Sequence, residues 1–261
     1  MLHFIDYEVT KYDWLCVIAS PTNQTETVIV NSPEKLRAYY NAHKDEIFVG
    51  YNIRDYDQWI FKGILAGFNP YEINEHIITK KLKGYQFSNT LREYPLIIYD
   101  VLQLNSSLKQ LEGMQGHNIY ESEIDFRINR KLTGAELAEM IQYCKNDVQE
   151  TMNLFIELKS DFDVQMELIN EFKLPLNAIS KTQTQLTAEI LQAERVDYKD
   201  EFNINFPPYL DRIKKYAHIV GWFKQFKTPL NLSEDAKKDI YAQKLNIDVA
   251  GKFTTCSTTG V

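Results

Sequence analysis

Hydrophobic positions near the start of the chain fall into three short runs of the kind that form β-strands. Aliphatic, aromatic and β-branched residues dominate residues 2–9, 13–20 and 25–31. Short polar segments separate these runs, and the segment from Pro21 to Asn23 has the composition of a turn. The pattern therefore predicts three consecutive strands that are joined as an antiparallel meander.

After residue 31 the pattern changes to an alternation of helical and strand-like segments. Ser32 and Pro33 have the residue types of an N-cap and a first helical position, which predicts a helix that ends at about His43. The following apolar runs predict a strand, a helix and a further strand, at residues 46–51, 56–67 and 96–101.

A longer helix is predicted toward the end of this first part of the chain. Thr133 and Glu136 have the Thr-x-x-Glu spacing of a capping box, and apolar residues then recur every three or four positions. The helix is expected to run from about Gly134 to Lys159. Three strands followed by alternating helices and strands indicate a mixed α/β fold.

Length and composition limit the number of domains and the ways in which the chain could bind nucleic acid. The chain has 261 residues, of which 44% are hydrophobic, so it can build one large domain or one domain with a helical extension. Its net charge of -7 argues against a protein that binds nucleic acid by overall positive charge. An enzyme that meets phosphate through bound metal ions and a local basic strip remains compatible with this charge.

Cysteine and histidine positions exclude several kinds of site. The spacing of Cys16, Cys144 and Cys256 fits neither a zinc knuckle nor a disulfide framework, and the five histidines are scattered without a His-x-x-x-His pair. The N-terminus lacks a signal-peptide pattern, and no apolar run approaches the roughly 20 residues that span a bilayer. We therefore expect a soluble, cytoplasmic protein without a membrane partner.

The first strand carries a pair of acidic residues. Residues i and i+2 of a strand share a face, so Asp6 and Glu8 point the same way and Tyr7 points to the opposite face. Two carboxylates in an apolar strand are costly unless a cation neutralises them, and oxygen ligands of this kind suit Mg²⁺ or Mn²⁺. The alternative is an edge strand with one solvated face.

A second acidic segment follows the strand predicted at residues 46–51. It opens the next helix, with Asn52 at its start and Asp57 in the first helical turn, near the positive end of the helix dipole. The alternative is that Asn52 or Asp55 caps the helix, and that Asp57 is an ordinary first-turn acid.

The third segment lies on the long helix. Tyr143 and Asp147 are four residues apart and therefore lie one above the other on one helical face. They flank the apolar positions Cys144 and Val148, so we expect them at the rim of the core and directed to the edge of the sheet. The alternative is a solvated Tyr–Asp pair.

The combination of these segments resembles a known family. An Asp-x-Glu on the first strand, an Asn-x-x-x-Tyr-Asp after a later strand and a Tyr-x-x-x-Asp on a late helix resemble the three exonuclease motifs of the Tyr-containing branch of the DEDD superfamily. Residues 63–70, 99–101 and 107–112 look like the exonuclease part of bacteriophage-type DNA polymerases. The resemblance covers residues 1 to about 250.

The resemblance implies a ribonuclease-H-like fold with a defined organisation. Residues 1–160 would form the exonuclease domain, with a mixed sheet flanked by helices. Residues 161–250 would be a helical extension that leads toward a polymerase domain, with clear helices at 182–194 and 209–223, and residues 251–261 would be a flexible tail.

The chain departs from the family pattern near its end. After residues 247–251 such proteins continue into a polymerase domain, whereas this chain ends ten residues later with no palm motif, so polymerisation is not implied. The expected alternatives are a piece of a longer protein, a split gene or a free-standing exonuclease. If a phage encodes it, the expected location is the host cytoplasm.

The resemblance also implies an activity and a role for each site residue. The activity is two-metal hydrolysis of single-stranded DNA from the 3′ end, as in polymerase proofreading, with two Mg²⁺ or Mn²⁺ ions ~3.5–4 Å apart. Asp6 would bridge both ions, Glu8 and Asp147 would complete the first site, and Asp57 would serve the second. Tyr143 would orient the attacking water by a hydrogen bond.

Substrate contacts are less sharply indicated. Tyr7 and Asn52 lie inside the motifs and are candidates to touch the terminal nucleotide, although Tyr7 could equally belong to the core. Asp100 ends a strand, where capping of the backbone is the simpler role. Local basic clusters, each also explained as a solvated face, are Lys80, Lys81 and Lys83; Arg127, Arg130 and Lys131; and Arg212, Lys214 and Lys215.

Two other functions remain open at this point. A DEDD site does not itself choose DNA over RNA, so a 3′–5′ exoribonuclease is one alternative. A scaffold that binds nucleic acid without cleaving it is the other, although all four acids and Tyr143 are present. Cleavage that depends on a metal ion would separate an enzyme from a scaffold.

Overall fold

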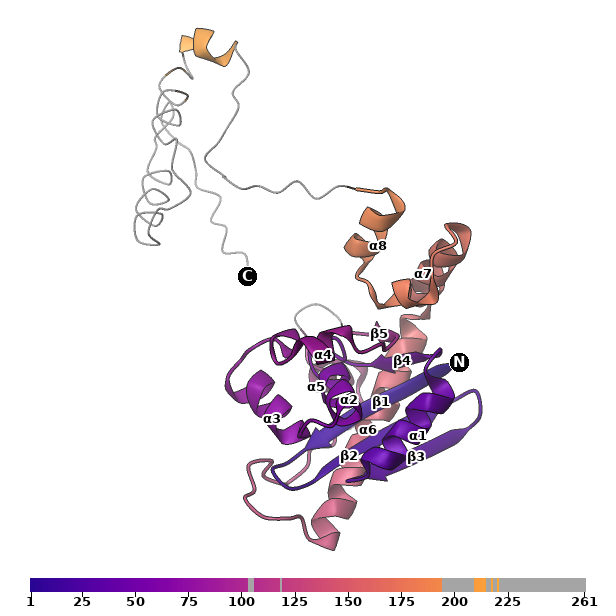
Figure 1. The fold of residues 1–261 in the computed structure, drawn as a ribbon. Helices are drawn as coiled ribbons and strands as arrows, with labels where there is room; N and C mark the ends of the chain where they lie inside the picture. Colours follow the sequence, from indigo (N-terminus) through magenta and orange to yellow (C-terminus); the bar gives the residue numbers. More distant parts are fainter. Residues whose placement is uncertain (103–105, 118, 194–208, 215–216, 218–219, 221–261) are drawn as a thin grey trace. The chain divides into compact units, whose positions relative to one another are not determined.

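The computed structural model describes residues 1–102, 106–117, 119–193, 209–214, 217 and 220 (Figure 1). The chain divides into two units, Met1–Ala193 and Glu194–Val261, and the fold below is that of the first. The helix predicted at 209–223 is described only in part, with a 3-10 turn at Leu210–Arg212. Residues 247–251 and the tail at 251–261 lie outside the described residues.

A five-stranded mixed sheet forms the centre of the first unit, in the order β3-β2-β1-β4-β5. The first three strands pair antiparallel, as the meander predicted, whereas β4 joins β1 and β5 joins β4 in parallel. The strands are β1 (Leu2–Val9), β2 (Trp14–Ser20), β3 (Thr25–Val30), β4 (Ile47–Gly50) and β5 (Ile98–Asp100). The predicted α/β class is confirmed.

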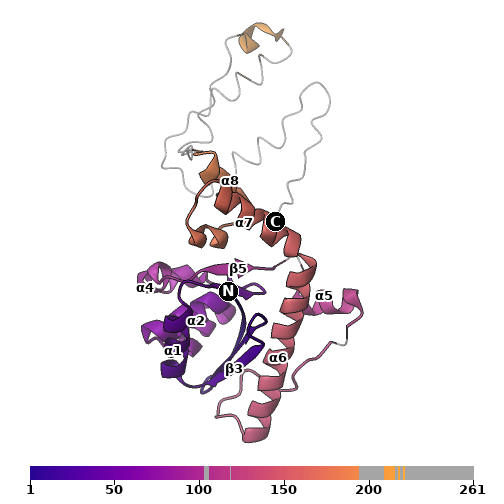
Figure 2. The same cartoon turned by 90° about the vertical axis from the view of Figure 1, so that its right-hand side faces the viewer.

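Helices cover both faces of this sheet (Figures 1 and 2). One hydrophobic core lies beneath α1 (Pro33–His43) and α2 (Asp57–Ala66) and includes Ile5 and Tyr7 of β1. The other lies beneath α6 (Gly134–Glu157) and includes Phe4 of β1. Successive side chains of β1 therefore enter opposite cores, as the alternation of a strand requires.

Sequence signals at helix starts are confirmed by the structure. Ser32 caps α1 by accepting a hydrogen bond from the backbone of Lys35, and Thr133 and Glu136 form the reciprocal capping box of α6. Thr182 likewise caps α8 (Gln183–Ile190), although this helix ends four residues before its predicted end. Side-chain capping is a local interaction, which is why sequence alone locates these starts.

The predicted end of the long helix is wrong by two residues. The helix α6 stops at Glu157, Leu158 leaves the helical conformation, and α7 (Lys159–Glu171) begins at once. The bend brings Phe162 against Phe155 and Tyr99, with ring centroids 5.2 and 4.9 Å apart. Packing of three aromatic rings thus overrides a helical periodicity that continues through the break.

Short helical elements between the predicted ones were missed. They are α3 (Pro70–Asn74), a π-helical turn (Glu75–Thr79), a 3-10 turn (Gly84–Gln86), α4 (Asn89–Glu93), α5 (Leu108–Gln115) and a 3-10 turn (Leu176–Ser180). Elements of three to eight residues are too short to show a hydrophobic period. Both α7 and α8 belong to the same compact unit as the sheet, and the functional boundary at residue 160 stays a prediction.

Candidate active site and metal centre

A cleft of about 1280 Å³ opens where β1 and β4 end. Both strands run in the same direction, so their carboxyl ends meet at one edge of the sheet, which is where open α/β sheets bind ligands. Its lining includes all the residues proposed from the sequence, namely Asp6, Tyr7, Glu8, Asn52, Asp57, Tyr143 and Asp147. Residues from three distant segments therefore converge in one place.

The chain reaches this cleft through a tight turn after β4. A Cβ atom on Gly50 would lie 2.8 Å from the Cβ of Ile53 and 3.2 Å from the carbonyl oxygen of Ile5. Glycine at this position allows the following loop to turn tightly beside the backbone of β1. The loop then delivers Asp57 to the cleft as the first residue of α2.

Asp100, at the end of β5, holds this loop in place. Its carboxylate accepts hydrogen bonds from the backbone N–H groups of Asn52, Arg54 and Leu102, at 2.9, 3.0 and 3.0 Å. Asn52 has a φ of +58°, a conformation that asparagine tolerates better than most residues. The capping role expected for Asp100 is confirmed. Its carboxylate holds the backbone of the loop in place.

Asp6 and Glu8 lie on the face of β1 that α6 covers. Carboxylate oxygens of Asp6, Glu8 and Asp147 all lie within 4.8 Å of one another. The thiol of Cys144, one turn before Asp147, donates a hydrogen bond of 3.2 Å to Asp6. Because β1 lies between β2 and β4, the alternative of an edge strand with a solvated face is wrong.

Asp57 approaches the same acids from the other side of the sheet edge. Its side chain is only 3% exposed, and its Oδ1 has no hydrogen-bond partner among the described residues. The N-cap residue of α2 is Tyr56, whose side chain makes no capping hydrogen bond to the helix, whereas Asp55 is exposed and pairs with Lys83 at 3.2 Å. Helix capping by Asn52 or Asp55 is therefore wrong as an explanation of this segment.

Burial and mutual repulsion make the acids hard to ionise together. Burial, followed by the charge of Asp147, raises the pKa of Asp6 to about 8. Burial and the neighbouring Asp6 also hold the pKa values of Glu8 and Asp57 well above their usual range. Ionised carboxylates at this spacing repel one another, and a nearby cation is needed to offset the repulsion. A bound metal ion is one such cation.

A lysine that the sequence analysis did not single out already supplies part of that charge. The Nζ atom of Lys109 lies 2.5 Å from Asp147 and 3.2 Å from Glu112, and 4.8 Å from the ring centre of Tyr143. Lys109 stands in the first turn of α5, whose capping box is formed by Ser107. That box is visible in the sequence, but the approach of α5 to α6 is not.

Tyr143 lies beside Asp147 at the rim of the cleft, as its spacing predicted. Burial and the neighbouring carboxylates, Asp147 first, raise the pKa of its phenol above the ordinary value. The rings of Tyr120 and Phe126 lie near it, each with its centroid 6.3 Å away. Tyr143 therefore stays protonated at neutral pH and offers a hydrogen-bond donor rather than a base.

The two residues predicted to contact a nucleotide differ in their surroundings. Tyr7 is 2% exposed, and its ring packs against Phe61 with centroids 5.8 Å apart, which agrees with the core interpretation. Its hydroxyl has no hydrogen-bond partner among the described residues. Asn52 lines the cleft and is half-buried, so its side chain stays a candidate contact.

The basic clusters contribute to the cleft only in part. Lys81 and Arg127 line it, whereas Lys83 pairs with Asp55 and Arg130 pairs with an acidic residue of α6. Lys80 and Lys131 are absent from its lining; Arg212 and Lys214 belong to the second unit, and Lys215 lies outside the described residues.

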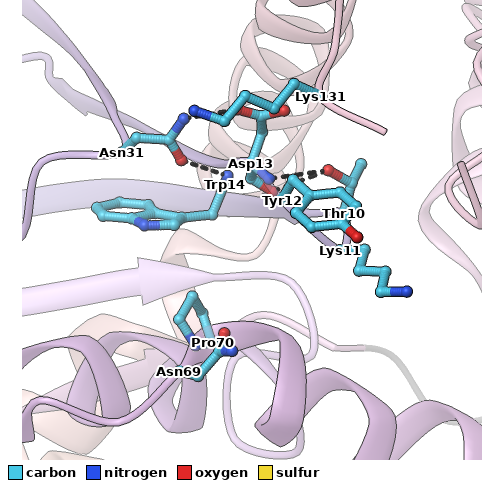
Figure 3. A pocket seen from close by; sticks show the side chains of 9 residues that line it. All are labelled: Thr10, Lys11, Tyr12, Asp13, Trp14, Asn31, Asn69, Pro70 and Lys131. Atoms are coloured by element: carbon cyan, nitrogen blue, oxygen red, sulfur yellow. Dashed lines mark hydrogen bonds between the residues drawn. The ribbon is translucent and has the colours of Figure 1, made fainter. Parts of the chain in front are cut away.

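A second hollow of about 430 Å³ lies beside the turn between β1 and β2 (Figure 3). Its central acid, Asp13, accepts hydrogen bonds from the side chain of Asn31 at 2.7 Å and from the backbone of Leu132 at 2.8 Å. These bonds satisfy the acid and tie the turn to the segment before α6. The larger cleft is therefore the better candidate for an active site.

Comparisons of the chain with protein-family models, with curated proteins and with solved structures give no match. Within the part of the chain that the structure describes, no helix combines the length and the apolar character that a membrane crossing requires. Any function assigned to the cleft therefore depends on its own geometry and chemistry.

Proposed function

We propose that this chain is a metal-dependent 3′–5′ exonuclease that hydrolyses single-stranded DNA ends, corresponding to the proofreading part of a bacteriophage-type DNA polymerase. One observation carries the proposal. Four acids and a tyrosine, from three segments far apart in sequence, converge in a single cleft in the motif order of the DEDD superfamily. The sheet supports it, because three antiparallel strands followed by two parallel ones are expected of a ribonuclease-H-like fold.

The residues of the cleft fit a pair of divalent cations. Asp6, Glu8 and Asp147 would hold one ion, and Asp57, whose buried Oδ1 has no hydrogen-bond partner in the described part of the chain, would hold the second together with Asp6. Carboxylate oxygens without cysteine or histidine ligands select Mg²⁺ or Mn²⁺. When bound, such ions activate an attacking water and stabilise the leaving 3′ oxygen.

Other cleft residues suit an unpaired strand rather than a duplex. Aromatic side chains give stacking surfaces for exposed bases, and Lys81 and Arg127 can neutralise phosphates. The phenol of Tyr143, which stays protonated, donates a hydrogen bond that orients the water. The partly exposed aromatic residues that line the cleft are Tyr51, Tyr56, Tyr71, Phe126 and Tyr143. A polymerase domain or subunit would deliver the frayed end.

Lys109 acts in this proposal as a resident cation that metal ions must displace from Asp147. The Lys109→Met protein is expected to lose about 2 kcal/mol of stability without metal, because Asp147 and Glu112 lose a charged hydrogen-bond partner. It is also expected to bind Mn²⁺ about tenfold more tightly. Urea unfolding measures the first effect, and calorimetric titration measures the second.

Lys83→Met is the matched control for this prediction. Lys83 is exposed, and its partner Asp55 lies outside the acid cluster, so neither quantity is expected to change. Weaker Mn²⁺ binding by Lys109→Met would show instead that the lysine arranges Asp147 for the ion.

The direct test of the function uses a 5′-labelled single-stranded DNA and an RNA of the same sequence. Each is incubated with the pure protein in Mn²⁺, in Mg²⁺ or in EDTA, and the products are separated by length. The expected result is a DNA ladder that shortens from the 3′ end and disappears with EDTA. A ladder on RNA alone would make the protein an exoribonuclease. Tight binding of DNA without any shortening would indicate that the protein is a scaffold that binds nucleic acid without cleaving it.

A further inference from the structure

Two histidines and a glutamate meet outside the cleft, at the opposite end of β1. His3 belongs to the start of β1, His43 to the last turn of α1, and Glu46 to the turn that leads into β4. The Oε2 atom of Glu46 lies 3.3 Å from Nδ1 of His43 and forms a short contact with Nε2 of His3. The three ligand atoms lie within 4.8 Å of one another.

The spacing of this cluster is close to what a small tetrahedral ion needs. Zinc–nitrogen and zinc–oxygen bonds of about 2.0–2.1 Å place neighbouring ligand atoms about 3.3–3.4 Å apart in a tetrahedron. The pair of His43 and Glu46 already has this separation. His3 and Glu46 lie closer together than this, so their side chains would move apart to admit an ion.

The surroundings hold the ligands in orientation and leave them accessible. The hydroxyl of Tyr39 lies 2.7 Å from Nδ1 of His3, which fixes the ring as partners behind metal ligands usually do. His3 is fully buried, whereas His43 and Glu46 are 25% and 27% exposed at the side chain, which leaves an approach from solvent. One ligand is therefore held in the core, and the other two can be reached from solvent.

Charge in this corner favours a cation. His43 lies in the last turn of α1, where the negative end of the helix dipole attracts positive charge. Burial lowers the pKa of His3, so its ring stays neutral, and the hydrogen bond from His3 lowers the pKa of Glu46, so its carboxylate stays ionised. Neutral imidazole and ionised carboxylate are the forms that bind metal.

We propose that His3, His43 and Glu46 form a second, non-catalytic site for a transition-metal ion of the zinc class, with its fourth position open to water. The ion would tie the start of β1 to the corner between α1 and β4. Imidazole ligands suit zinc, whereas the oxygen-only cleft suits Mg²⁺ or Mn²⁺, so the two sites sort ions by ligand type. This inference does not depend on the activity of the cleft.

The same residues also satisfy one another without an ion. In that state Nε2–H of His3 donates to Glu46, and the hydroxyl of Tyr39 donates to Nδ1. Metal binding requires the proton of His3 to move from Nε2 to Nδ1, where the oxygen of Tyr39 can accept its hydrogen bond. A measurement of zinc affinity therefore distinguishes a metal site from a cluster that is only hydrogen-bonded.

The test is made on Asp6→Asn protein, to weaken metal binding in the cleft. We expect Zn²⁺ at about one hundred times its Kd to raise Tm by about 5 °C, and Co²⁺ to give the visible absorption of a tetrahedral complex. Both signals are expected to vanish when His43→Gln or Glu46→Gln is added. His76→Gln is the matched control and should keep both, because His76 bonds to the backbone of Lys83 far from the cluster.

Two variants keep the outcome decisive. His43 and Glu46 are partly exposed, so either glutamine variant is expected to fold, and metal-free Tm and circular dichroism check this directly. Equal Zn²⁺ shifts with and without His43, or no shift in Asp6→Asn protein, would overturn the site and leave two histidines that are hydrogen-bonded to Glu46.

Discussion

Asp57→Asn protein is expected to release nucleotides about a thousandfold more slowly than wild type, whereas Asp55→Asn protein should stay within about twofold. The two acids are two residues apart but differ in position. Asp57 is buried near the other acids, with one oxygen that has no hydrogen-bond partner within the residues the structure describes, and Asp55 is exposed and paired with Lys83. An amide at 57 keeps the shape of the side chain but removes the charge that a divalent ion requires.

The measurement is the initial rate of release from the 3′ end of labelled DNA at saturating Mn²⁺. Thermal unfolding of each protein confirms that the substitution leaves the fold intact. Similar rates for the two variants would remove Asp57 from the site and would restore the interpretation of this segment as an ordinary helix start.

The metal-free protein is expected to become less stable as the pH rises from 5.5 to 7.5, with a fall in Tm of roughly 5 °C. In the unfolded chain Asp6 loses its proton near its usual pKa, whereas in the folded cleft its pKa is about 8. Between these values the folded state binds more protons than the unfolded state, so stability falls as pH increases. Glu8 and Asp57, whose pKa values are also raised, act in the same direction.

Manganese should reverse this trend, because a bound cation favours the ionised acids. We expect Mn²⁺ to raise Tm more at pH 7.5 than at pH 5.5, and more in wild type than in Asp6→Ala protein. Asp6→Asn, which cannot ionise, should make the fall in Tm with pH smaller without metal. Equal Mn²⁺ shifts in wild type and Asp6→Ala would count against a metal site at Asp6.

Sequence predicted the parts of the site that depend on local spacing. Strand alternation placed Asp6 and Glu8 on one face, and helical spacing placed Tyr143 above Asp147. What it could not show were contacts made by chain segments that meet only in the fold. The approach of Lys109 to Asp147 depends on how α5 packs on α6, and no local pattern encodes that packing.

The same limit applies to the rest of the fold. The three antiparallel strands follow from alternation and short turns, whereas the tie between Asp100 and the loop after β4 depends on the parallel pairing of β4 with β5. His3 and His43 are forty residues apart and appear unrelated in the sequence, but β1 and α1 bring their rings to a centroid distance of 4.5 Å. Short helices escaped prediction because elements of three to eight residues are too short to show a hydrophobic period.

The helix α6 has a consequence for the synthesis of the chain. It supplies both the last acid of the cleft, Asp147, and the cover for the second face of the sheet. A nascent chain on the ribosome therefore lacks a complete acid cluster until α6 has emerged, and its second core closes only when later residues such as Ile169 and Leu186 have also emerged. The proposed nuclease would become competent at the moment its fold closes, and the growing chain would remain inert toward nearby nucleic acid until then.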